Sequence, residues 1–113
     1  MSDCIFCKIA KGEIPSNKVY EDEKILAFKD LDPQAPVHIL LIPKAHIAGA
    51  DEITEENSDV VAHIFCVASR LAKEMNLERG YRIVTNCGEE GGQSVRHLHF
   101  HLLGGGSMAW PPG

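Results

Sequence analysis

The spacing of apolar and polar residues along this chain predicts one long helix, over residues 54–76. Apolar side chains recur there every three or four residues and form one stripe on a helical surface: Val60, Val61, Ile64, Phe65, Ala68, Leu71, Ala72 and Met75. We expect Thr54 to cap the N-terminus of this helix, with Glu55 and Glu56 near the positive end of its dipole. Asn76 can take the left-handed conformation that ends a helix.

The remainder of the chain has the patterns of a short helix and several strands. Residues 4–11 place apolar side chains at helical spacing, and Gly12 ends that segment. The stretch 37–42 is almost continuously apolar, as in a strand that is covered on both faces, and Pro43 ends it. Strands are expected at 18–21, 24–30, 37–42, 81–86 and 97–103.

This order of elements predicts an α+β fold, in which an antiparallel meander of strands is crossed by one long helix, with a short helix near the N-terminus. At 113 residues we expect a single domain, 1–113. A domain of this size has a high ratio of surface to volume, so dimerisation would help to stabilise it.

The formal net charge of −5 changes the picture of possible partners. Proteins that bind the nucleic-acid backbone carry a basic face, so this charge argues against nucleic acid as a partner. The first residues lack the basic and apolar segments of a signal peptide, and no apolar run reaches the length of a membrane span. We therefore expect a cytoplasmic protein without a membrane partner, whose four cysteines are reduced.

Three histidines alternate with apolar residues in the last expected strand. Successive side chains of a strand point to opposite faces, so His97, His99 and His101 share one face and the apolar residues between them point to the core. Two kinds of chemistry fit this row: chelation of zinc with a third ligand from elsewhere, or covalent catalysis by neutral imidazole. Cys4 and Cys7 offer a second set of metal ligands, and spacing alone leaves the division of the six histidines between these roles open.

The loop before this row has the composition of a ligand-binding segment. Gly91 and Gly92 let the backbone approach a ligand closely. Gln93 and Ser94 add neutral hydrogen-bond donors. The loop and the histidine row together therefore predict one functional site.

The run His97-Leu98-His99-Phe100-His101-Leu102-Leu103 resembles the signature of the histidine-triad family. The resemblance covers nearly the whole chain and is to the Hint branch of that family. It is also carried by Ile5-Phe6, Glu13-Ile14-Pro15, Leu26-Ala27-Phe28, Pro33-Gln34-Ala35-Pro36, Gly92-Gln93-Ser94 and Trp110-Pro111-Pro112-Gly113. It implies a homodimer of α+β protomers that join their sheets, and hydrolysis of purine nucleoside 5′-phosphoramidates.

The same resemblance implies roles for individual residues. His99 would be the nucleophile that takes the nucleotidyl group, and three companions would orient it or donate to phosphate oxygens: His38, His97 and His101. Ser94 or a neighbouring histidine would relay a proton to the leaving amine. Asp30 would accept from the ribose hydroxyls, although an aspartate at the end of a strand can also simply cap the following turn. The base would lie in an apolar slot made by Ile5, Phe6, Phe28 and Leu40, and the other implied substrate contacts are Asn86, Gly92, Gln93, Ser94, Val95 and Trp110.

Catalysis of this kind needs no metal cofactor, but the resemblance also bears on zinc. Some members of the family have two cysteines that match Cys4 and Cys7, in structural zinc sites completed by two histidines, which here match His46 and His97. We favour this zinc site over a packing role because a two-residue gap suits a tetrahedral pair of thiolates. Packing roles are expected for Cys66, on the inner half of the long helix, and for Cys87, whereas His63 is expected to be solvated.

Other functions remain alternatives to the phosphoramidase. One is a nucleotide-binding regulatory protein whose hydrolysis is incidental, and another is a hydrolase of dinucleoside polyphosphates. A zinc hydrolase that uses the triad as ligands lacks an acidic general base at suitable spacing. Ser94 and the Trp110-Pro111-Pro112-Gly113 ending favour the Hint branch.

Overall fold

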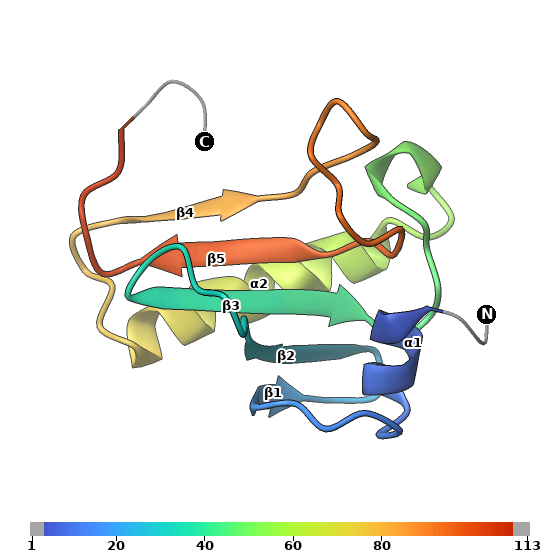
Figure 1. The fold of residues 1–113 in the computed structure, drawn as a ribbon, viewed down its shortest axis with the longest axis horizontal. Helices are drawn as coiled ribbons and strands as arrows, with labels where there is room; N and C mark the ends of the chain where they lie inside the picture. The colour runs from blue at the N-terminus through green and yellow to red at the C-terminus, as the bar shows by residue number, and fades with distance from the viewer. Residues whose placement is uncertain (1–3, 110–113) are drawn as a thin grey trace.

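Five antiparallel strands form one sheet in the computed structural model of this protein, which describes residues 4–109 (Figure 1). Their order across the sheet is β1-β2-β3-β5-β4. The elements are α1 (Ile5–Ala10), β1 (Lys18–Glu21), β2 (Ile25–Lys29), β3 (Val37–Pro43), the 3₁₀ turn η1 (Ala50–Glu52), α2 (Asp59–Glu74), β4 (Tyr81–Val84) and β5 (Phe100–Gly104). The α+β architecture expected from the sequence is confirmed.

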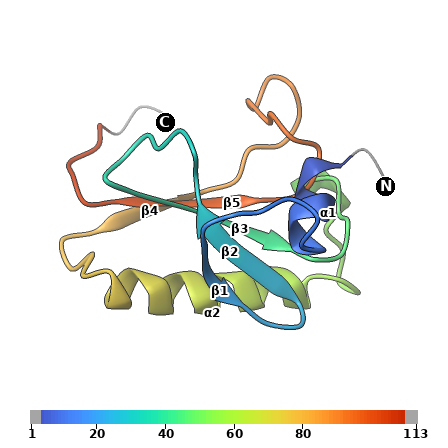
Figure 2. The ribbon, with the colours of Figure 1, turned by 60° about the horizontal axis from the view of Figure 1, so that its bottom comes forward.

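Apolar residues of β3 are buried on both faces because a helix packs against each. α2 lies along one face of the sheet, and α1 packs at one end of the other face (Figure 2). Ile39 and Leu41 belong to the cluster beneath α2, whereas Leu40 and Ile42 belong to the cluster that includes Phe6 of α1. This alternation explains why 37–42 is apolar at nearly every position.

The long helix begins at Asp59 and not at residue 54, so the expectation that Thr54 caps it is wrong. The backbone N–H of Thr54 donates to Oδ1 of Asn57 (2.7 Å), and Nδ2 of Asn57 donates to the carbonyl of Glu52 (3.1 Å). The Asn57 side chain thus stabilises a turn where a first helical turn was expected. At the other end of α2, the left-handed conformation expected for Asn76 is confirmed by its φ of 61°.

Two polar positions on α2 differ from expectation. Cys66 is exposed and lies off the buried stripe, so its expected packing role is wrong. His63 is not simply solvated, because its Nε2 lies 2.6 Å from Oδ2 of Asp22 in the turn between β1 and β2. Burial alone would raise the pKa of Asp22, but hydrogen bonds from His63, two backbone amides and a tyrosine hydroxyl lower it. This contact ties α2 to the edge of the sheet.

The two strands nearest the histidine row are shorter than expected. β4 ends at Val84 and not at residue 86, and β5 begins at Phe100 and not at residue 97. The backbone N–H of Leu98 donates to the carbonyl of Ile47 (2.6 Å), outside the sheet ladder.

Neither helix within residues 4–109 combines the length and the apolar composition needed to cross a bilayer.

Candidate active site

The three histidines of the row lie on one face of the chain, as the alternation predicts. Leu98, Phe100 and Leu102 enter the core beneath α2. His97 and His99 are buried on the opposite side, where the ring of Phe6 meets both edge-on at centroid distances of 5.9 and 5.1 Å. The ring of His101 lies 5.2 Å from that of His99. α1 therefore packs against the end of the row that holds His97 and His99.

The hydrogen bond of His99 determines which of its ring nitrogens is free. Nδ1 of His99 lies 2.7 Å from the backbone carbonyl of His97, which can only accept, so Nδ1 carries the proton. The neutral ring then has its lone pair on Nε2. Among residues 4–109, Nε2 has no hydrogen-bond partner. This tautomer is the one that an imidazole nucleophile requires.

His101 pairs with His38, the histidine of β3. Nε2 of His38 lies 2.8 Å from Nδ1 of His101. Burial, with smaller effects from His99 and His38, lowers the pKa of His101 to about 4. Burial also lowers the pKa of His38, against the opposing effects of Asp30 and Asp32. Both imidazoles are therefore neutral near pH 7.

His97 turns away from this pair toward the two N-terminal cysteines. Its Nε2 donates to the carbonyl of Pro43 (2.8 Å), so the lone pair lies on Nδ1. That Nδ1 lies 3.2 Å from Sγ of Cys4 and 3.6 Å from Sγ of Cys7. Burial lowers the pKa of His97 and keeps this nitrogen free of a proton.

A fourth donor completes this cluster and gives it the form of a metal centre. Nδ1 of His46 lies 3.3 Å from Sγ of Cys7, and the donor atoms of Cys4, Cys7, His46 and His97 all lie within 4.8 Å of one another. In a tetrahedral site with bonds of about 2.3 Å to sulfur and about 2.0 Å to nitrogen, neighbouring donors lie about 3.5 Å apart. The two thiols and two imidazoles therefore fit a structural zinc ion.

The residues expected to bind the base and the sugar lie next to the histidine row. Phe6, Phe28 and Leu40 share one buried cluster, with Val95 packed against it, whereas Ile5 is 46% exposed and lies outside that cluster. Oδ1 of Asp30 accepts the backbone N–H of Asp32 (2.8 Å), which is the turn-capping role, and Oδ2 lies 3.4 Å from Nε2 of His38. One carboxylate oxygen thus shapes the turn and the other faces the paired histidines.

The side chain of Gln93 stabilises the loop that precedes the three histidines. Its Oε1 accepts from the backbone N–H of Gly88 (2.9 Å) and from Nη1 of Arg96 (2.7 Å). Its Nε2 donates to the carbonyls of Ala48 (2.7 Å) and Val95 (2.9 Å). All four hydrogen-bonding positions of the amide are thereby occupied within the chain. Gln93 can contact a substrate only by giving up one of these bonds.

The other loop residues expected at the site are more accessible. Gly92 is exposed with a φ of 84°, a conformation that favours glycine, and Ser94 is also exposed. Nδ2 of Asn86 donates to the carbonyl of Gly91 (2.8 Å), which closes the base of the loop. Trp110 lies outside the described residues.

A cleft of about 370 Å³ opens beside the paired histidines. Its lining includes His38, His101 and Asn86, together with Met108 of the C-terminal tail and Arg82, which the sequence analysis did not single out. Nη2 of Arg82 donates to the carbonyl of Ala109 (2.7 Å) and so holds the C-terminal segment beside the cleft.

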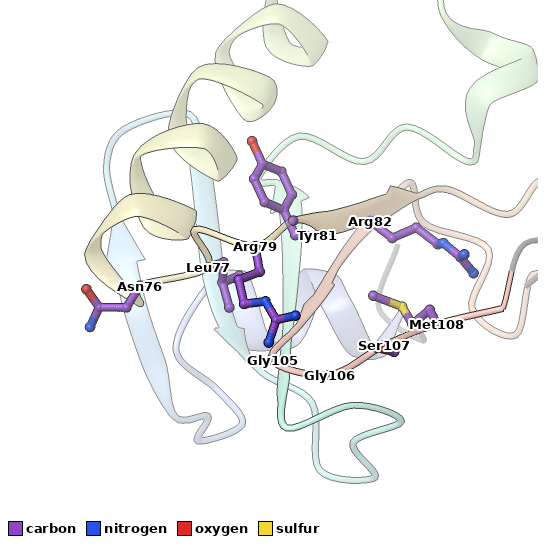
Figure 3. Close-up of a pocket in the computed structure, with 10 residues that line it drawn as sticks. Asn76, Leu77, Arg79, Tyr81, Arg82, Gly105, Gly106, Ser107 and Met108 are labelled. Atoms are coloured by element: carbon purple, nitrogen blue, oxygen red, sulfur yellow. The ribbon is translucent and has the colours of Figure 1, made fainter.

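A larger cavity of about 600 Å³ lies between the C-terminal end of α2 and residues 105–108 (Figure 3). Arg79, Tyr81 and Arg82 line it, but no histidine does. Arg82 and Met108 line both hollows. His101 borders only the smaller cleft, and among residues 4–109 its Nε2 has no hydrogen-bond partner. Because the ring of His99 lies 5.2 Å from that of His101, the smaller cleft is the better candidate for a reaction site.

Comparisons with known proteins agree with this geometry. Residues 3–109 match the family model described as "Scavenger mRNA decapping enzyme C-term binding". The chain is 53% identical to a 14 kDa zinc-binding protein of Zea mays over 99% of this chain and 89% of that one, and 49% identical to the adenylylsulfatase HINT1 of Arabidopsis thaliana over 99% and 78%. A crystal structure of a HIT family hydrolase from Legionella pneumophila superposes with a TM-score of 0.96, at 53% identity over 98% of this chain and 100% of that chain. The protein belongs to the histidine-triad family and is Hint-like.

Proposed function

We propose that this protein hydrolyses purine nucleoside 5′-phosphoramidates to a nucleoside monophosphate and an amine, through a nucleotidyl group carried on His99. The observation that carries the proposal is the hydrogen bond from Nδ1 of His99 to the carbonyl of His97 (2.7 Å), because it leaves Nε2 as a free lone pair. Relatives named as a HIT family hydrolase and as an adenylylsulfatase support hydrolysis of a nucleotide as the general chemistry.

The reaction follows from the arrangement of the imidazoles. Nε2 of His99 attacks phosphorus, the bond from phosphorus to nitrogen breaks, and the amine takes a proton from Ser94, a neighbouring imidazole or water. A neutral nucleophile avoids the repulsion that an anion would meet at an anionic phosphorus centre. Donors from His101 and the loop stabilise charge on the phosphoryl oxygens. Water then attacks the nucleotidyl group, releases the monophosphate and restores His99.

We also propose that Cys4, Cys7, His46 and His97 hold a structural zinc ion. The relative named as a zinc-binding protein and the spacing of the four donors support this site. When bound, zinc supplies a cross-link between α1, the segment after β3 and the histidine row. The catalytic steps need no metal, and the reduced thiols that zinc requires suit a cytoplasmic protein.

A two-fold dimer is the assembly that we propose. β4 pairs only with β5 among the described strands, so it is an edge of the sheet. Tyr81 on that strand is 42% exposed and Phe65 on α2 is 44% exposed, and burying such apolar surface between two copies stabilises both. Light scattering at micromolar concentration should return the mass of a dimer, and the mass of a monomer would contradict the assembly.

Replacing the nucleophile tests the proposed reaction. The His99→Ala variant should lose at least about a thousandfold in kcat against adenosine 5′-phosphoramidate. Intact-mass measurement of quenched wild-type protein should detect one acid-labile nucleotidyl group, which the variant lacks. His63→Ala is the control, because His63 contacts Asp22 on the far side of the sheet and should retain turnover. Normal turnover by His99→Ala would end the proposal.

A further inference from the structure

The backbone N–H of Gln34 points at the pair of histidines beside the cleft. It donates to Nδ1 of His38 at 3.0 Å, and Gln34 also lines the cleft itself. A backbone N–H can only donate, so Nδ1 of His38 has to accept and cannot carry a proton in the neutral ring. The proton of neutral His38 therefore lies on Nε2.

The proton on Nε2 of His38 fixes its partner in turn. Nε2 of His38 lies 2.8 Å from Nδ1 of His101, so it donates and Nδ1 of His101 accepts. Burial keeps both rings neutral near pH 7, so His101 has its one proton on Nε2. Oδ2 of Asp30, 3.4 Å from Nε2 of His38, favours the same arrangement because a carboxylate accepts only.

The loop that presents the amide is built to hold it in place. Oδ1 of Asp30 accepts from the backbone N–H of Asp32, and Nε2 of Gln34 donates to the carbonyl of Asp32 (2.9 Å). The backbone N–H of Asp30 donates to the carbonyl of His38 (3.0 Å), which closes the loop at its base. Pro33 and Pro36 restrict the backbone between these contacts.

We propose that the backbone N–H of Gln34 sets the direction of the hydrogen bond between His38 and His101, so that His101 offers an N–H and not a lone pair to the phosphoryl group. Gln34 is thus a positioning residue that acts through two imidazoles, a role that rests on the proposed function. In the reverse arrangement, Nε2 of His101 would face the phosphoryl oxygens with a lone pair and repel them. The amide thereby turns a symmetric pair of rings into a directed donor.

The same arrangement disfavours metal at this end of the row. Donor atoms of Asp30, His38 and His101 lie within 4.8 Å of one another, a grouping of two imidazoles and a carboxylate that metals can use. A metal on Nε2 of His38 would force the proton onto Nδ1, against the N–H of Gln34. The amide therefore keeps these rings as hydrogen-bonding groups.

Removing one N–H tests the proposal by NMR of the histidine ring nitrogens, which reports each tautomer directly. The Gln34→Pro variant lacks the N–H, whereas Gln34→Ala removes the side chain and keeps the N–H. Ala35→Pro is the proline control, because no hydrogen bond from the N–H of Ala35 is found within residues 4–109. If Gln34→Pro does not fold, an ester in place of the peptide bond at the nitrogen of residue 34 removes the same N–H without restricting the backbone.

In the wild type and both controls, His38 and His101 should carry their protons on Nε2. Loss of the N–H should raise the fraction of His38 protonated on Nδ1 about tenfold, since one neutral hydrogen bond accounts for a factor of that order. The kcat for phosphoramidate should fall with little change in KM. A wild-type His38 protonated on Nδ1, or unchanged tautomers after loss of the N–H, would overturn the proposal. Expected tautomers in a wild type without phosphoramidase activity would reject the proposed function alone.

Discussion

The buried imidazole of His101 should make folding stability depend on pH in a window above that of the carboxylates. Its pKa is about 4 in the folded protein and about 6.5 in an unfolded chain. Between these values the unfolded chain binds a proton that the folded protein does not, so stability falls as pH falls. The contribution is fully present above about pH 6.5 and is lost progressively toward about pH 4.

The magnitude follows from the two pKa values. One pKa unit corresponds to about 1.4 kcal/mol, so the full loss is about 3 kcal/mol and the loss between about pH 7 and about pH 4.5 is about 2 kcal/mol. Carboxylates with lowered pKa values, such as Asp22 and Asp51, lose their contributions below about pH 4 and stay outside this window. His38 and His97, whose pKa values burial also lowers, act in the same direction as His101.

Comparison with a variant isolates the share of His101. Urea denaturation of the wild type and of His101→Gln, at matched protein concentration and at about pH 7 and about pH 4.5, gives four free energies of unfolding. The wild type should lose about 2 kcal/mol more than the variant, because glutamine fills a similar volume and does not titrate. Equal losses in the two proteins would show that His101 is not held neutral by the fold.

Two other predictions concern the ligands. Purified protein should contain about one zinc ion per chain, and replacing Cys4 and Cys7 together with serine should release it and lower the melting temperature more than the activity; an unchanged melting temperature would favour a packing role for the thiols. Wild-type enzyme should prefer ribose over deoxyribose substrates by roughly ten- to a hundredfold in kcat/KM, and Asp30→Asn should shrink that preference. Equal rates with ribose and 2′,3′-dideoxyribose substrates would leave Asp30 as a turn residue only.

The parts of the fold that depend on periodicity could be predicted from the sequence. Alternation separates His97, His99 and His101 from the residues that pack beneath α2, and the apolar run of β3 is covered on both faces. The residues at which helices and strands begin and end were harder to predict, because side chains that hydrogen-bond to the nearby backbone compete with regular secondary structure. Asn57 delays the start of α2 in this way.

Contacts of the backbone could not be predicted from a pattern of side chains. The N–H of Gln34 meets His38 only because a turn places it there, and an amide donor is common to every residue except proline. Gln93 resembled a substrate contact, yet the partners of its amide include Ala48, far away in sequence. The sequence did not indicate a role for Arg82, because the hydrogen-bond partner of its side chain, the carbonyl of Ala109, is again a backbone atom.

The error in the start of β5 bears on the chemistry of the site. Had the strand begun at residue 97, the carbonyls of 97–99 would have been available to the sheet ladder. Instead the carbonyl of His97 accepts from Nδ1 of His99, and the carbonyl of His99 accepts from the hydroxyl of Thr85 (2.7 Å). The irregular backbone therefore supplies the acceptor that selects the reactive tautomer of His99. The ring of His97 contacts the thiol of Cys4, and the backbone carbonyl of His97 accepts the hydrogen bond from the ring of His99. Any change in the metal site that moves the backbone at residue 97 therefore also moves the nucleophile.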